Sequence, residues 1–262
     1  MDWSLLLLRV ALFFYAIAFL NTFLPAWPGR RRSVRWTPWM AAAGGLAHTG
    51  SITALGVALH RCPVGSLPEV LSLLAWTTIL VYIVIAWRYR IEVLHAIILP
   101  IVLVVLFVSD ILPSEVVPIA APLRPWLRPL HIFVIVLGVA ALFITFAASL
   151  VYVLVDRGLK AKRPARFFLV LPSLERCEDV GRTSLFWAYP LLTLGIVTGA
   201  IFSASLHGRF WTWEPEEALA IFSWLILGMV VAARLVWGWR GRRASILTLV
   251  GCAAVFLRML GV

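Results

Sequence analysis

Residues 130–154 read LHIFVIVLGVAALFITFAASLVYVL, a run of 25 positions without Asp, Glu, Lys or Arg. About 20 apolar residues wound as an α-helix are enough to cross the roughly 30 Å hydrocarbon core of a bilayer. This segment therefore predicts a membrane-spanning helix, and the segments on either side of it follow the same pattern.

The composition of the whole chain also favours a membrane protein. Of its 262 residues, 62% are hydrophobic and only 13% are charged, and the mean hydropathy is +0.97. Soluble domains carry about 25% charged residues, and disordered chains are far more polar. The composition thus excludes both an ordinary cytosolic globular protein and a disordered one.

Charged or Gly/Pro-rich breaks divide the chain into eight apolar segments. They lie near residues 4–26, 37–59, 68–87, 93–109, 129–155, 183–205, 218–236 and 244–262. The first segment lacks a basic leading region and is long enough to span, so we interpret it as a retained helix rather than a signal peptide. We predict an all-α, polytopic membrane helix bundle of about eight transmembrane helices. Residues 1–262 are expected to form a single integral membrane domain.

The distribution of basic residues predicts the orientation of these segments. Four alternate connections (28–36, 88–92, 156–182 and the end of the seventh segment) carry 17 of the 23 Lys and Arg residues. Because Lys and Arg accumulate in cytoplasmic loops, these connections are predicted to be cytoplasmic and both termini outside. The location expected is the cell (inner or plasma) membrane. Topology also accounts for the net charge of +11, so the bilayer is the expected partner and nucleic acid is not.

Few residues in this chain point to side-chain catalysis. The three cysteines, Cys62, Cys177 and Cys252, are far apart and favour neither a disulfide framework, a zinc site nor a thioredoxin-like redox centre. The sequence shows no nucleophile–base pair, phosphate-cradling loop or metal-carboxylate cluster. We therefore predict that the protein is not an enzyme.

The connection between the sixth and seventh segments is the most unusual stretch of the chain. Residues 206–217 read LHGRFWTWEPEE, in which two tryptophans alternate with polar residues between Gly208 and Pro215. The pattern predicts a rigid turn that presents two large flat rings on one side. Such rings suit an interfacial aromatic belt, or a planar ligand such as a porphyrin with a nearby imidazole as axial ligand. Its glutamates fit a solvated acidic loop with a local ion pair at Arg209, or general acid–base work.

Residues 199–228, GAIFSASLHGRFWTWEPEEALAIFSWLILG, resemble the tryptophan-rich signature of the cytochrome c assembly family. This family includes the CcsA/ResC-type heme-handling proteins and their HemX-like relatives. The matching positions are Gly199, Gly208, Trp211, Trp213, Pro215, Glu217, Trp224 and Leu225, with Phe210 in the place of a tyrosine. The fifth segment and GWRGRRA at 238–244 extend the resemblance, which is strongest over 129–262.

The resemblance implies an integral membrane heme-handling protein that binds heme at the outer face for cytochrome c assembly. The implied partners are apocytochrome c and a second membrane assembly subunit. Ligation of heme to cytochrome c by a complex that contains such a partner stays open. His131 matches the family's outward axial histidine, and the tryptophans match the surface against which heme rests. The predicted heme-binding residues are His131, His207, Gly208, Phe210, Trp211, Trp213, Glu214, Pro215 and the mid-membrane His48.

The chain departs from the family pattern at several positions. Glu214 stands in place of Asp, Glu216 in place of Lys, His207 in place of Trp, and Ala232 in place of the seventh-helix histidine that ligates heme. The sequence ends at Val262, whereas the family's synthases continue into an outer segment that supplies the second axial ligand. We therefore predict His131 and His207 as the axial pair.

Two other functions and several histidine roles stay open. The protein could be a HemX-like regulatory or interaction protein without productive heme transfer, or a small-solute transporter. His48 lies in the middle of its segment, where a polar residue is costly and often functional, or serves a helix–helix hydrogen bond. His60 and His95 lie near segment ends, where a solvated role is expected.

Overall fold

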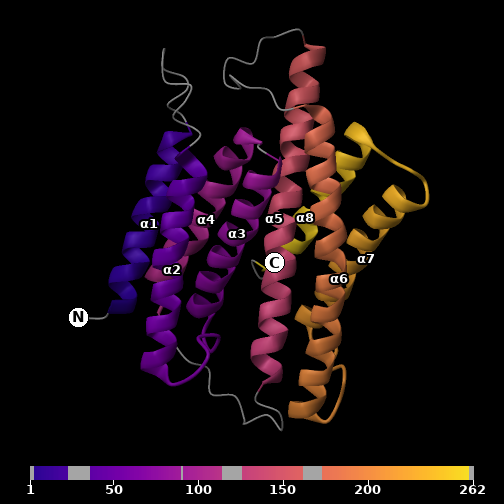
Figure 1. The fold of residues 1–262 in the computed structure, drawn as a ribbon. Helices are drawn as coiled ribbons and strands as arrows, with labels where there is room; N and C mark the ends of the chain where they lie inside the picture. Colours follow the sequence, from indigo (N-terminus) through magenta and orange to yellow (C-terminus); the bar gives the residue numbers. More distant parts are fainter. Residues whose placement is uncertain (1–2, 23–35, 90, 114–125, 162–172, 260–262) are drawn as a thin grey trace. The chain divides into compact units, whose positions relative to one another are not determined.

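The computed structural model describes residues 3–22, 36–89, 91–113, 126–161 and 173–259. Within these ranges the regular structure is entirely helical (Figure 1). The α-helices are α1 (Trp3–Asn21), α2 (Thr37–Leu59), α3 (Leu67–Tyr89), α4 (His95–Ile111), α5 (Leu127–Lys160), α6 (Leu174–His207), α7 (Pro215–Leu235) and α8 (Gly241–Met259), and the short 3-10 helix η3 (Glu92–Leu94) precedes α4. Each predicted segment corresponds to one α-helix, which confirms the all-α class.

Six of the described helices are long and apolar enough to cross a membrane: α1, α2, α3, α5, α6 and α7. Helix α4 is also apolar but has 17 residues, and α8 begins with a glycine followed by two arginines. The structure thus confirms a polytopic membrane bundle. The prediction that α4 and α8 also span the bilayer stays a prediction.

Helices α5 and α6 are the longest, with 34 residues each. Helix α6 begins at Leu174, nine residues before the predicted segment, and α5 continues to Lys160. At 1.5 Å per residue each is about 51 Å long, well beyond the roughly 30 Å hydrocarbon core. The apolar pattern therefore located the middle of each helix and missed its charged extension.

The chain divides into two compact units. Unit 1 comprises Met1–Val116 and Val155–Arg176, and unit 2 comprises Val117–Leu154 and Cys177–Val262. In unit 1, α2 packs on α1 and α3, and α4 packs on α3 and α1, as Figure 1 shows for the indigo-to-magenta helices. The expectation of a single domain stays a prediction.

Unit 2 has a core to which all four of its helices contribute. Leu142 of α5, Leu185 of α6, Leu227 of α7 and Cys252 of α8 are each completely buried. Apolar side chains that pack at this density hold the helices in a fixed arrangement. This core positions the residues described below.

A buried ion pair joins α6, α7 and α8 in unit 2. Arg234 Nη1 donates to Glu178 Oε1 at 2.5 Å, and Arg234 Nη2 donates to Thr248 Oγ1 at 3.1 Å. The other carboxylate oxygen of Glu178 accepts a hydrogen bond from the backbone N–H of Gly241 at 3.1 Å, at the start of α8. The basic residues at the end of the seventh segment were expected in a cytoplasmic connection, whereas the side chain of one of them, Arg234, is buried.

Candidate functional site

Two glycines of α6 allow α5 to approach closely. A Cβ built on Gly195 would lie 2.6 Å from Ile135 Cγ1, and one built on Gly199 would lie 2.7 Å from His131 Cε1. Glycines four residues apart let helix backbones approach in membranes, since they place no side chain between them. The Gly195–Gly199 spacing therefore creates the place in which the His131 ring lies.

The imidazole of His131 is held by three residues of one face of α6. Its Nδ1 is 3.1 Å from Thr198 Oγ1, and its ring lies parallel to that of Phe202, with centroids 6.5 Å apart and an interplanar angle of 11°. Gly199 leaves room for the ring between them. His131, the residue that the resemblance assigned as an axial ligand, is thus a half-buried, oriented imidazole.

The connection between α6 and α7 has a defined backbone conformation. Gly208 has a φ of +68° and its N–H bonds to the carbonyl of Ala204 at 3.0 Å, which ends α6. Glu217 Oε2 accepts hydrogen bonds from the N–H groups of Thr212 at 2.8 Å and Trp213 at 3.0 Å. These bonds hold Trp213 at a φ of 59°, which is uncommon for a residue with a side chain. The structure thus gives Glu217 a role in holding the loop.

The two tryptophans of this loop form a corner rather than one flat surface. Their ring centroids are 6.1 Å apart and their planes meet at 76°. Trp213 and Phe210 are 79% and 68% exposed, whereas the Nε1 of Trp211 is buried and has no hydrogen-bond acceptor among the described residues. The two rings therefore contact each other edge to face and do not form one plane, while their presentation on one side of the turn stays a prediction.

Trp224, another residue of the tryptophan-rich signature, lies inside unit 2 between α6 and α7. Its Nε1 donates to Thr193 Oγ1 at 2.8 Å, and its ring stacks on Tyr189 with centroids 5.6 Å apart and an angle of 13°. Gly228, one turn further along α7, lies against the Tyr189 hydroxyl. Trp224 therefore holds α7 against the helix that carries Thr198 and Gly199.

The remaining predicted site residues are placed as follows. Glu214 precedes α7 in extended conformation and Pro215 begins the helix. His207 is the last residue of α6, and its side chain and that of Glu216 lie outside the described structure. His207 lies eight positions after Gly199 in α6, or about 12 Å further along the helix axis. His131 and the loop belong to the same unit.

His48 belongs to unit 1 and both of its ring nitrogens are engaged. Nδ1 lies 3.3 Å from the Tyr15 hydroxyl and Nε2 lies 2.9 Å from Ser72 Oγ. The side chain is fully buried, so these bonds join α1, α2 and α3. The arrangement matches the helix–helix hydrogen bond rather than an iron ligand, which would need one nitrogen released.

The other two histidines differ from each other. His95 is 2% exposed, and its Nδ1 lies 2.5 Å from the hydroxyl of the fully buried Tyr82. The solvated role expected for His95 is therefore wrong, because α4 begins inside unit 1 rather than at its surface. His60 ends α2 in the left-handed conformation, with a φ of 51°, and is exposed.

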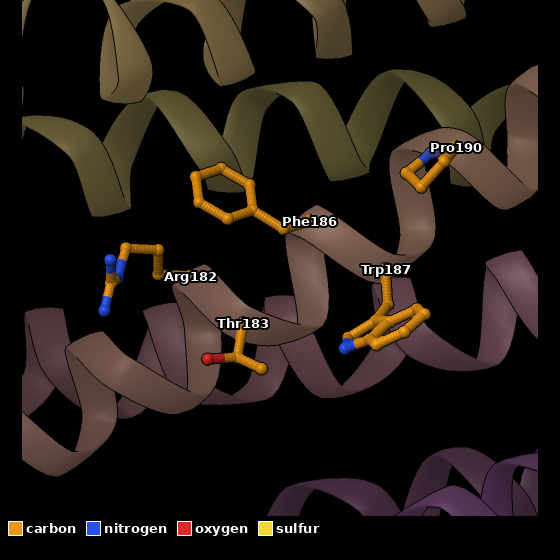
Figure 2. Close-up of a pocket in the computed structure, with 5 residues that line it drawn as sticks. All are labelled: Arg182, Thr183, Phe186, Trp187 and Pro190. Carbon is orange, nitrogen blue, oxygen red and sulfur yellow. The ribbon is translucent and has the colours of Figure 1, made fainter.

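Figure 2 shows a pocket lined by other residues than those described so far. It is lined by Arg182, Thr183, Phe186, Trp187 and Pro190, which all belong to α6. Arg182 pairs with Asp179 at 3.4 Å on the exposed side of the helix. Because no predicted site residue lines it, this pocket is not the candidate site.

Comparison with known proteins identifies the family. The profile of the family described as "Cytochrome C assembly protein" matches residues 64–262. Cytochrome c biogenesis protein CcsA of Guillardia theta is 26% identical over 219 residues, and that of Synechococcus sp. (strain CC9902) is 29% identical over 226. The CcsA of Heterosigma akashiwo is 31% identical over 237 residues. Each of the three matches covers 76% of this chain and 73–74% of the relative.

A solved structure, the cytochrome c heme lyase CcmF, shares the fold. Its TM-score is 0.71 at 18% sequence identity, and the match covers 96% of this chain. The chain spans about half of that structure, since the match covers 46% of it. The profile match over more than half of the sequence decides the family: this chain belongs to the cytochrome c assembly proteins.

Proposed function

We propose that the protein is a membrane heme-handling factor of cytochrome c assembly, and that it binds heme in unit 2 between His131 and the loop at 208–214. The observation that carries the proposal is the oriented imidazole of His131, held by Thr198, Gly199 and Phe202 of α6. The names of the relatives, a cytochrome c biogenesis protein and a cytochrome c heme lyase, agree with this function.

The donor set of the site fits heme. Imidazole nitrogen is a common axial ligand of heme iron. The exposed rings of Phe210 and Trp213 offer apolar surface to a macrocycle. The Nε1 of Trp211, which has no acceptor among the described residues, can donate to a propionate carboxylate. Gly208, Glu214 and Pro215 would shape the loop, and His207 is the candidate for the second axial position.

Heme is the cargo in this proposal, and the protein acts as an assembly factor rather than as an enzyme. Bound heme would supply the vinyl groups to which apocytochrome c thiols become attached, with a second membrane subunit assisting. The residues of this chain would hold the heme, orient its iron through His131 and shield one face with aromatic side chains. The site would face the outer side of the plasma membrane.

An absorption spectrum tests the proposal. The full chain, expressed in heme-replete cells and purified in detergent, should show a Soret band that His131→Ala abolishes. His60→Asn is the matched control, because it removes an exposed imidazole and asparagine tolerates the left-handed conformation found there. A wild-type protein without a Soret band, or equal heme in His131→Ala, would refute heme binding at this site.

The HemX-like regulatory function is the second candidate. The observation that favours it is Ala232, which puts a methyl group on α7 where the family has a heme-ligating histidine. A protein that binds a partner subunit but takes up no heme would support this function. The outer orientation has its own test: a reporter active only in the cytoplasm should be active in the 156–182 connection and silent after Val262.

A further inference from the structure

The pocket on α6 lies where this helix changes from charged to apolar composition. Residues 175–182 include five charged side chains, whereas residues 183–208 contain no Asp, Glu, Lys or Arg. A helix that passes from water into hydrocarbon changes in this way, so Arg182 is expected at the level of the lipid headgroups. Trp187, which is 68% exposed, agrees with that level, because tryptophan is enriched at membrane interfaces. The pocket thus belongs to the boundary between headgroups and hydrocarbon.

Two polar side chains of the pocket have hydrogen-bonding groups to spare. Every other threonine in the described helices has a hydrogen-bond partner for its hydroxyl, usually the carbonyl four residues earlier. Thr183 is the exception among the described residues. Arg182 donates through Nη2 to Asp179 Oδ1 at 3.4 Å, a long contact between two half-exposed side chains. A guanidinium has five N–H groups, so most of the donors of Arg182 remain for a ligand.

The rest of the pocket is apolar and follows the helix axis. In Figure 2 the two polar residues lie at one end of the pocket, Pro190 lies at the other end, and Phe186 and Trp187 lie between them. The pocket is an open hollow with a volume of about 390 Å³. Ala188, on the opposite face of α6, is completely buried in the core of unit 2. The hollow therefore offers, in order along α6, the charged and the apolar surface that a phospholipid needs for its headgroup and an acyl chain.

We propose that this hollow binds one membrane phospholipid, independently of heme. The guanidinium of Arg182 and the hydroxyl of Thr183 donate to the phosphate oxygens, and an acyl chain lies between Phe186 and Trp187. Charge complementarity favours this occupant, because guanidinium and phosphate form strong charge-assisted hydrogen bonds. A free phosphate ion would leave the apolar end of the hollow unfilled. The carboxylate of Asp179 opposes the phosphate, but water and salt screen a side chain that is 49% exposed.

Native mass spectrometry of the full chain, delipidated in detergent and titrated with phosphatidylglycerol, tests the proposal. We expect one lipid to bind more tightly than the others. Arg182→Gln should weaken its binding about fivefold, the usual effect of one basic residue at an anionic lipid surface. Thr183→Val keeps the shape and loses one hydrogen bond, so it should weaken binding about threefold, whereas Asp179→Asn should strengthen it. Arg243→Gln is the matched control, because it removes an exposed cation from α8 and should leave this lipid bound as in the wild type.

Two competitors separate the parts of the ligand. Neither diacylglycerol with the same acyl chains, which lacks the phosphate, nor glycerol 3-phosphate, which lacks the chains, should displace the bound lipid. Displacement by either one would overturn the proposal, and so would equal weakening in Arg182→Gln and Arg243→Gln, since attraction would then depend on total charge alone. Thr183→Val is nearly isosteric and keeps the test valid if Arg182→Gln fails to fold. Unchanged lipid binding in a folded Thr183→Val variant would overturn the part assigned to the hydroxyl.

Discussion

Replacing Arg234 with methionine removes the cation from the buried ion pair of unit 2 while keeping much of the side-chain volume. The guanidinium is 2% exposed and its Glu178 partner is 13% exposed, so neither charge is well solvated. After the substitution, the Glu178 carboxylate keeps the Gly241 N–H as its one described hydrogen-bond donor. Thr248 remains satisfied, because its hydroxyl donates to the carbonyl of Ala244 at 2.7 Å.

The expected cost follows from the charge left behind. Breaking a buried pair by removing one partner costs about 3–5 kcal/mol, because the other charge stays buried without compensation. The Nε of Arg234 is buried without an acceptor among the described residues. The substitution removes this unsatisfied N–H, which offsets part of the lost stability. We therefore expect a loss near the lower end, about 3 kcal/mol. For a protein of this size that is a fall of about 6–12 °C in Tm.

A double variant separates the charge from the packing. In Arg234→Met with Glu178→Gln no charge remains, and the glutamine oxygen can still accept from Gly241. We expect this variant to lie within about 1 kcal/mol of the wild type, since well-packed neutral replacements of buried pairs are often neutral. Thermal unfolding in detergent measures all three proteins. A single variant less than about 1 kcal/mol below the wild type, or a double variant as unstable as the single one, would refute the reasoning.

Three further predictions concern the candidate site. Gly199→Ala puts a methyl group against His131. We expect the free energy of unfolding to fall by about 1–3 kcal/mol in thermal unfolding, together with a weaker Soret band. An unchanged Tm would contradict the close contact. Glu217→Ala removes the acceptor of the two loop N–H groups and so lowers the free energy of local opening of the loop. Trypsin should then cleave after Arg209 about fivefold faster for each kcal/mol by which that free energy falls. Cleavage at other sites serves as the internal control. Trp224→Phe keeps a ring in the stack but loses one interhelical hydrogen bond, which should cost about 0.6 kcal/mol by denaturant titration, and a loss several times larger would show that the indole shape matters more than its N–H.

The sequence predicted the number and the class of the helices because an uninterrupted apolar run as long as 130–154 is typical of a membrane-spanning helix. It placed the start of α6 nine residues too late, since Glu175, Arg176 and Glu178 interrupt the apolar pattern but not the helix. The hydropathy pattern indicates the part of a helix that lies inside the bilayer. It does not locate the end of a helix that continues into water. The burial of Arg234 was missed because it depends on Glu178, which lies 56 positions away on another helix.

The site was predictable only in part. The family resemblance assigned His131, but its partner Thr198 lies 67 positions away and meets it only where two helices cross. The Gly195–Gly199 spacing is a sequence signal of close helix packing, but it does not say which residue of another helix lies there. The corner between the tryptophans depends on the positive φ of Trp213, which local propensity opposes and which the hydrogen bond from its own N–H to the Glu217 carboxylate stabilises.

The contacts at the crossing of α5 and α6 also determine the register in which the two helices pack. Sliding by one turn would place Gly195 against His131 but Leu191 against Ile135, where a Cβ at the position of Gly195 would lie 2.6 Å from Ile135 Cγ1. In the shifted register Leu194 would also occupy the place of Thr198, and its side chain has no oxygen to bond to the imidazole. The two glycines and the hydroxyl group of Thr198 thus select the same alignment of the two helices.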